Sequence, residues 1–153
     1  MPLASAAAPG QTPTFRFDRE AGRTLLAMWD ESVKTQQERV ACLAATARND
    51  TVFVHRVRPL EPVEADSLGT SAELSIADCG PPAWSGTVHT HVAEYRNGRP
   101  SSRFSAQDRG VMRMWYERWR TDGVFCVVHG PEQARCEADG VVGGMRSVPR
   151  LAP

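Results

Sequence analysis

Two histidines separated by a single residue are the part of this sequence best suited to chemistry. His89 and His91 end the run from Trp84 to His91, whose composition is typical of a β-strand. Alternate residues of a strand point to the same face, so both imidazoles can converge on one ion, and imidazole is a good ligand for zinc. Alone, the pair is a weak indicator of a metal site, because polar histidines also line strand ends without binding metal.

A catalytic zinc site takes three protein ligands and keeps a position open for water. Asp108 is the natural third ligand, one turn into a helix predicted from Ser105 to Arg120. The helix begins like a capping box, with aspartate in place of glutamate or glutamine. Ser105 and Asp108 have an ordinary alternative explanation, a helix cap and a first-turn acid that need no metal. The apolar stripe of this helix is predicted to consist of Val111, Met114, Trp115 and Trp119.

Together, these segments resemble the signature of the JAB/MPN (JAMM) family of zinc metalloproteases. That signature is a pair H-[S/T]-H followed by S-x-x-D, and this chain has His89-Thr-His91 followed by Ser105-Ala-Gln-Asp108. The family usually has seven residues between the second histidine and the serine, whereas this chain has thirteen, residues 92–104. The extra residues fall in a polar loop, where insertions are tolerated.

The family also carries a glutamate on a strand after an N-terminal helix, in the context E-x-x-G-x-L-x-G. The segment Glu38-Arg-Val-Ala-Cys-Leu-Ala-Ala45 matches it in place and spacing, with alanine at both glycine positions. The alternative for Glu38 is an ordinary carboxylate at a strand end. The resemblance runs from about residue 18 to residue 137, with the elements in the family's order.

The resemblance implies a role for each of these residues. Zinc would be held by His89, His91 and Asp108. Glu38 would act as general base and then acid, taking a proton from water and giving it to the leaving amine. Ser105 would stabilise the oxyanion of the tetrahedral intermediate. Thr90 points to the opposite face of its strand and is expected to be structural.

For the substrate, the resemblance implies a peptidase or isopeptidase that cleaves after the C-terminal tail of a ubiquitin-like protein, in maturation or deconjugation. A single-domain chain is most similar to the prokaryotic branch, in which E1/E2-like enzymes of the same operon, including antiphage defence operons, are expected partners. The loop 92–104 carries Tyr95, Arg96, Arg99 and Arg103 and is expected either to contact the substrate or to be plain solvated chain.

The elements that must position these residues predict one α/β domain, a mixed β-sheet packed against helices as in the JAB/MPN (cytidine-deaminase-like) fold. We expect residues 1–14 to be a disordered tail, 15–138 the metalloprotease domain and 139–153 a C-terminal tail. A helix is predicted from Asp18 to about Lys34. Strands are predicted at residues 38–45, 51–57, 84–91, 124–129 and 133–137.

Charge and cysteine usage bound the function further. Eighteen basic and eighteen acidic residues cancel, which does not favour nucleic acid as a partner, and no segment has the length and apolarity of a membrane span. The four cysteines (Cys42, Cys79, Cys126 and Cys136) form no CxxC pair. We expect them to be free thiols and, without a secretory signal, the protein to be cytoplasmic.

Three other functions remain as alternatives. The first is a non-catalytic MPN scaffold that binds a protein partner, although such relatives typically lack part of the metal-binding set that is complete here. The second is a RadC-like protein linked to DNA, to which the neutral charge gives little support. The third is a zinc deaminase of related fold, for which the P-C-x-x-C ligand pair is missing.

Overall fold

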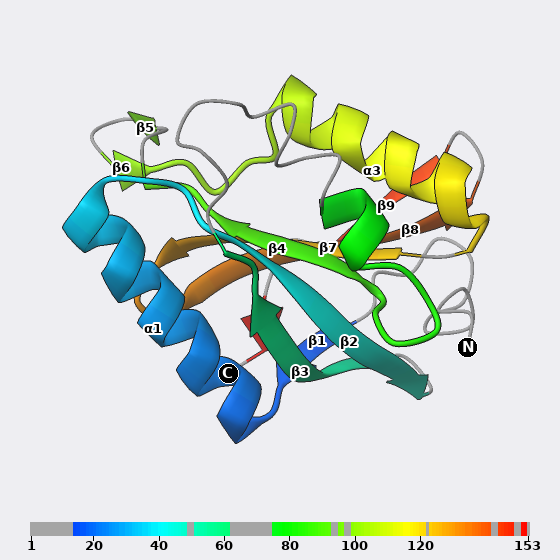
Figure 1. Ribbon diagram of the computed structural model, residues 1–153, viewed down its shortest axis with the longest axis horizontal. Coiled ribbons are helices and arrows are strands. Elements are labelled where there is room, and N and C mark those ends of the chain that lie inside the picture. Colours follow the sequence, from blue (N-terminus) through cyan, green and yellow to red (C-terminus); the bar gives the residue numbers. More distant parts are fainter. Residues whose placement is uncertain are drawn as a thin grey trace.

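A mixed β-sheet carries the histidine pair on one of its central strands (Figure 1). The computed structural model describes residues 14–48, 51–61, 75–92, 95–96, 99–121, 123–141, 144–148 and 151–152. Among these residues eight strands form the main sheet in the order β10-β1-β3-β2-β4-β7-β8-β9. The domain is therefore mixed α/β, as the order of elements predicted.

The strands of the main sheet are β1 (Thr14–Phe17), β2 (Val40–Arg48), β3 (Thr51–Pro59), β4 (Gly86–Thr90), β7 (Gly123–Gly130), β8 (Gln133–Val141), β9 (Gly144–Val148) and β10 (Leu151–Ala152). The helices are α1 (Arg19–Thr35) and α3 (Ala106–Trp119), with one helical turn at residues 75–78. The short strands β5 (Tyr95–Arg96) and β6 (Arg99–Pro100) pair with each other inside the predicted loop 92–104.

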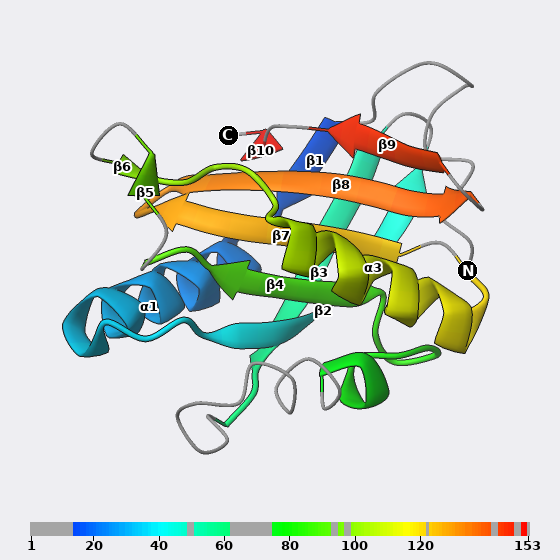
Figure 2. The same cartoon turned by 90° about the horizontal axis from the view of Figure 1, so that it is seen from above.

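The two helices cover opposite faces of the sheet (Figure 2). The side chains of β7 alternate between these two faces. Val124, Cys126 and Val128 belong to the core that α1 covers, whereas Phe125 and Val127 pack with α3. This strand is apolar on both faces because both faces are buried. Side chains that alternate with the α1 core, including His89 of β4 and His91 directly after it, therefore face α3.

Helix α1 begins where the sequence predicts, because the Asp18 side chain accepts the N–H of Ala21 at 2.9 Å as an N-cap. It ends at Thr35, with Gln36 in the left-handed region as C-cap. Its buried face consists of Ala21, Leu25, Met28, Trp29 and Ser32. The predicted helix is therefore confirmed.

Helix α3 has the predicted capping box, but its buried face differs from the prediction. Met112 and Trp115 are buried, whereas Met114 is 45% exposed. Trp115 and Trp119 lie one turn apart, and Met112 precedes Trp115 by three residues, so these three share a face that leaves Met114 outside. Of the predicted stripe, Trp115 is buried and Val111 and Trp119 pack against the same core, so the prediction was wrong only for Met114, in whose place Met112 is buried.

All four cysteines are paired, which corrects the expectation of free thiols. Cys126 and Cys136 are register partners on the antiparallel strands β7 and β8, with Cα atoms 4.1 Å apart, and form a disulfide. Cys42 of β2 forms a second disulfide with Cys79, 37 residues away. Neither pair has a short-range spacing, so only the strand register and the placement of residue 79 reveal them.

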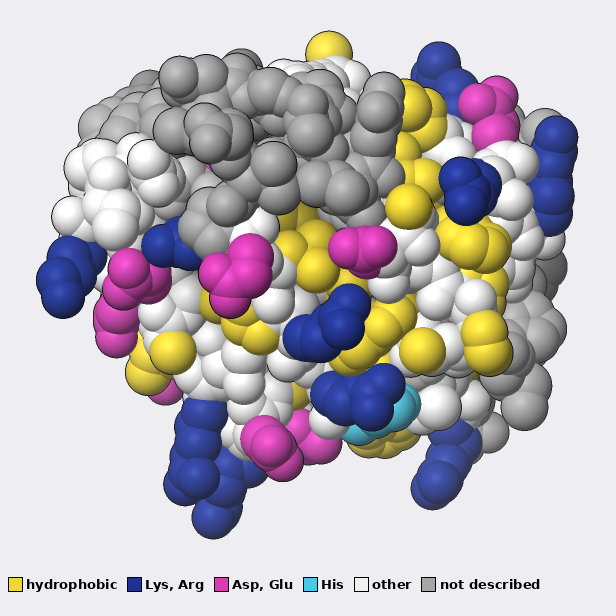
Figure 3. All heavy atoms as spheres, viewed as in Figure 1, with side chains coloured by type: hydrophobic (Ala, Val, Ile, Leu, Met, Phe, Trp, Pro, Cys, Tyr) yellow, Lys and Arg dark blue, Asp and Glu magenta, His cyan; other side chains and the backbone are white. Residues whose placement is uncertain are grey.

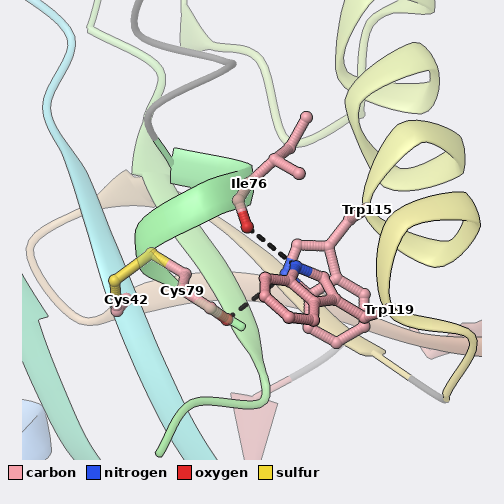
Figure 4. Close-up of a disulfide and its surroundings, with 5 residues drawn as sticks. All are labelled: Cys42, Ile76, Cys79, Trp115 and Trp119. Atoms are coloured by element: carbon pink, nitrogen blue, oxygen red, sulfur yellow. Dashed lines mark hydrogen bonds between the residues drawn. A yellow bond between two sulfur atoms is a disulfide. The ribbon is translucent and has the colours of Figure 1, made fainter. Parts of the chain in front are cut away.

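Residues 75–79 are held by a disulfide to β2 and by hydrogen bonds from two indoles of α3 (Figure 4). Trp115 donates to the carbonyl of Cys79 at 3.3 Å, and Trp119 donates to the carbonyl of Ile76 at 2.8 Å. Residues 75–79 therefore link helix α3 to β2.

The sheet continues beyond residue 138, the predicted end of the domain. Strand β8 runs to Val141, β9 pairs with it, and β10 adds in parallel beside β1. The predicted N-terminal tail lies, except for Thr14, outside the described residues.

Of the helices that the structure describes, none combines the length and apolarity needed to cross a membrane. Basic and acidic side chains intersperse on the face shown in Figure 3.

Candidate metal centre

Side chains of three residues meet at the end of β4, on the face of the sheet that α3 covers. The Nε2 atoms of His89 and His91 lie 3.0 Å apart. Each also lies 3.2 Å from one oxygen of Asp108, His89 from Oδ1 and His91 from Oδ2. The structure thus brings together the three residues that the sequence singled out as ligands, and this group could hold a metal ion.

The separations between the two nitrogens, and from each nitrogen to one oxygen of Asp108, fit a small tetrahedral cation. Zinc–nitrogen and zinc–oxygen bonds of about 2.0–2.1 Å separate neighbouring ligand atoms by about 3.3 Å in tetrahedral geometry. The observed separations of 3.0 to 3.2 Å are close to that value. The donor set of two imidazoles and one carboxylate also suits zinc.

The ring of His91 is oriented by a second contact. Its Nδ1 lies 2.9 Å from the carbonyl oxygen of Ser101, so Nδ1 carries the proton and donates it there. In neutral His91 the Nε2 lone pair then faces a carboxylate oxygen of Asp108, a contact that needs a proton or a cation between the two atoms. The side chain of His91 is 1% exposed, so this contact is shielded from solvent. Metal-binding histidines usually donate the N–H of the other ring nitrogen in this way, to a carbonyl, a carboxylate or water.

Asp108 is presented by the first turn of α3. Its Oδ2 accepts the backbone N–H of Ser105 at 2.8 Å, and its own backbone N–H donates to Ser105 Oγ at 3.0 Å. Burial by itself would raise the pKa of the carboxyl. The hydrogen bonds from His89 and His91, the charge of His89 and the Ser105 N–H outweigh burial and hold the pKa of Asp108 well below its usual range. The carboxylate is therefore ionised, as a metal ligand must be.

Glu38 precedes β2 rather than lying within it, one difference from the prediction of a strand residue. Val40 is paired with His89, the N–H of Thr90 donates to the carbonyl of Arg39, and the N–H of Arg39 donates to the Thr90 hydroxyl. Glu38 is the residue directly before Arg39, so it follows these contacts at the end of β4 where His91 lies. Glu38 is half-buried.

Ser105 is half-buried at the N-cap of α3. Because its oxygen accepts the Asp108 N–H, the hydroxyl proton is free to be donated to a ligand beside the centre. The structure therefore leaves Ser105 both roles that the sequence offered, the helix cap and a hydrogen-bond donor. The cap is observed, whereas the donor role is a prediction.

Several neighbours of the centre were not identified from the sequence. Ser101 acts through its backbone carbonyl, which no side-chain pattern can reveal. His129 ends β7, where burial lowers its pKa, and the charges of Arg135 and His91 lower the pKa further. His129 can be recognised as a neighbour of the centre only because it lies near the end of a strand adjacent to β4. The sequence does not reveal which strands are adjacent.

A further contact fixes α3 on the sheet next to the third ligand. Arg109 donates two hydrogen bonds to Glu137 of β8, at 2.5 and 2.9 Å. The Glu137 side chain is 2% exposed, and that of Arg109 is 39% exposed. The guanidinium also lies over the Phe104 ring, 5.3 Å from its centroid. This pair holds the first turn of α3, and with it Asp108, against β8.

The chain matches no family model, and no curated protein matches it. Among solved structures it is similar to the solution structure of protein DSY2949 from Desulfitobacterium hafniense, with a TM-score of 0.50 and 17% sequence identity. The match covers 82% of this chain and 82% of that chain. At this identity the likeness shows a shared fold alone.

Proposed function

We propose that this protein is a zinc-dependent peptidase or isopeptidase of JAB/MPN (JAMM) type, which cleaves after the C-terminal tail of a ubiquitin-like protein. The observation that carries the proposal is the convergence of His89, His91 and Asp108 to within 3.2 Å of one another. The position of Glu38, directly before the residue that Thr90 binds, supports it, because it brings a carboxylate to the strand end that carries the histidines.

The ligands would be His89, His91 and Asp108, and bound zinc supplies a Lewis acid that acidifies water and polarises a carbonyl. The carboxylate of Glu38 takes the proton of the attacking water and transfers it to the leaving amine, so the same residue serves as base and then as acid. Ser105 donates its hydroxyl proton to the oxygen that becomes negative during attack.

The substrate class rests on the resemblance of the motif. The extended tail of a ubiquitin-like protein presents a peptide or isopeptide carbonyl without a folded neighbour in the way. The β5–β6 pair lies beyond the end of β4 that carries the histidines (Figure 1), where it can contact the body of such a substrate. The same cleavage is maturation when a peptide extends the tail and deconjugation when the tail is joined to another protein.

The test is the substitution Glu38→Gln. The amide keeps the size of the side chain but cannot accept a proton from water, so cleavage of a ubiquitin-like fusion should fall by about a hundredfold to ten-thousandfold. Zinc content and thermal unfolding should match the wild type. Glu117→Gln, at an exposed position of α3, is the matched control and should cleave normally.

A scaffold would behave differently in the same experiment. If the wild type cleaves no tail-linked fusion, while wild type and Glu38→Gln bind the partner equally, the non-catalytic alternative replaces the enzyme. The partner proteins to include first are ubiquitin-like proteins encoded beside E1-like and E2-like reading frames.

A further inference from the structure

We propose that Thr90, the residue between the two histidines, is a positioning residue that fixes the general base Glu38 through its side-chain hydroxyl. The inference rests on the proposed function of Glu38 and identifies how that residue is held in place. Thr90 itself contacts neither substrate nor metal, because it faces the α1 side of the sheet while both histidines face α3.

The Thr90 hydroxyl is completely buried and occupied on two sides. Its Oγ1 accepts the backbone N–H of Arg39 at 2.9 Å, and it lies 2.6 Å from Oγ of Ser32 in helix α1. The two backbones are also joined directly, since the N–H of Thr90 donates to the carbonyl of Arg39 at 3.0 Å. Thr90 therefore forms hydrogen bonds with both the N–H and the carbonyl of Arg39.

These contacts extend the pairing of β2 with β4 beyond the end of the regular strand. The strand ladder ends at Val40 opposite His89, and the next N–H, that of Arg39, is bonded by a side chain instead. We call the two hydrogen bonds between Thr90 and the backbone of Arg39 the Thr90 clamp. Glu38 is the next residue, so the clamp sets the direction of its backbone. The side chain of Arg39 contributes one contact to Glu31, at 3.3 Å, on the exposed surface of α1.

The contacts of Thr90 with Arg39 also link Glu38 to the metal ligands. Thr90 is adjacent in sequence to both His89 and His91, so any shift of β4 moves the ligands and the clamp together. Ser32 ties the same hydroxyl to α1, the helix that leads into the segment holding Glu38. The base and the metal ligands are thereby held in one rigid unit.

The decisive variant is Thr90→Val, which keeps the side-chain shape and removes the hydroxyl. A displacement of about 1 Å in a catalytic group can cost on the order of a hundredfold in rate. We expect kcat to fall by about tenfold to a hundredfold with KM and zinc content unchanged, and Thr90→Ser to restore most of kcat. Thr87→Val makes the same change at another buried position of β4 and should leave kcat within about twofold.

A role through Glu38 also predicts non-additivity. In the Glu38→Gln background, Thr90→Val should lower the residual rate by less than about twofold, because the group it positions is already gone. Equal losses in both backgrounds would overturn the proposal, as would equal losses in Thr90→Val and Thr90→Ser.

A readout independent of activity separates this inference from the proposed function. Amide hydrogen exchange at Arg39 should be at least about tenfold faster in Thr90→Val than in the wild type and near wild type in Thr90→Ser. An unchanged rate in Thr90→Val would overturn the clamp even in an active enzyme. Faster exchange in Thr90→Val, when the wild-type protein cleaves nothing, would leave the clamp in place and refute only the function.

Discussion

Ser105 and Asp108 cap each other, since each side chain accepts the backbone N–H of the other, at 3.0 and 2.8 Å. The Asp108 oxygen that caps the helix is also the one that lies 3.2 Å from Nε2 of His91. The helix terminus therefore orients the third ligand before any metal binds. A capping box and a metal ligand, which the sequence presents as alternative explanations, are compatible in this structure.

The first prediction concerns metal binding. Asp108→Asn keeps an oxygen that can accept the Ser105 N–H, so α3 should stay capped, but the negative charge is lost. Losing a group that merely hydrogen-bonds to a ligand costs roughly 10–100-fold in metal affinity, and losing a ligand should cost more. We expect zinc affinity, measured by competition with a chromophoric chelator, to fall by more than about a hundredfold. Asp30→Asn, on the exposed side of α1, should bind zinc normally, and equal affinity in both variants would exclude Asp108 as a ligand.

A pH dependence of stability is expected from the same carboxylate in the metal-free protein. Its pKa in the folded state is below the ordinary value of 3.8, so it contributes stability that is complete above that value. The contribution is lost as the pH falls below about 4. The difference in unfolding free energy between wild type and Asp108→Asn, from urea titrations, should therefore shrink below about pH 4. A difference that is the same at pH 3 and pH 6 would contradict the lowered pKa.

The sequence predicted the parts of this molecule that depend on local pattern. Asp18 and Ser105 begin their helices because a short polar side chain before an amphipathic run satisfies the first free N–H groups. The histidine pair shares a face because strand side chains alternate. The features that the sequence did not reveal depend on register and tertiary contact. Cys126 pairs with Cys136 only because two strands align at those residues, and β10 finds its partner, β1, near the other end of the sequence.

The disulfides give a prediction of their own. In the chain-entropy description a disulfide stabilises by about 2–4 kcal/mol, and more when it closes a longer loop. Cys42–Cys79 spans 37 residues and Cys126–Cys136 spans 10. Replacing the first pair by serine should therefore destabilise the protein by about 1 kcal/mol more than replacing the second. Denaturant titrations under oxidising conditions measure this difference. Four reactive thiols in unreduced, denatured wild type would contradict both pairings.

The Arg109–Glu137 pair predicts a strong asymmetry between single and double variants. Arg109→Met leaves the buried Glu137 carboxylate without this partner, and breaking such a pair typically costs about 3–5 kcal/mol. The double variant Arg109→Met/Glu137→Met removes both charges and should recover most of that loss. A double-mutant cycle on unfolding free energies measures the coupling. Additive losses would mean that the two side chains act independently in holding α3.

The last prediction concerns residues 92–104, where this chain departs most from the family it resembles. The structure places two features in this segment: the carbonyl of Ser101 orients His91, and the β5–β6 pair projects beyond the end of β4. Tyr95 pairs with Pro100, so the chain between them can be shortened without moving either end. Replacing residues 96–99 by Asn-Gly, which favours a two-residue hairpin turn, should therefore keep Ser101 in place.

We expect this shortened chain to bind zinc normally and to cleave a short peptide that carries the tail at the wild-type rate. Turnover of a folded ubiquitin-like fusion should be weaker, because only a folded substrate reaches far enough to contact the pair. Loss on both substrates would show that the segment positions the centre through Ser101 and His91. Full activity on both would assign it no part in recognition.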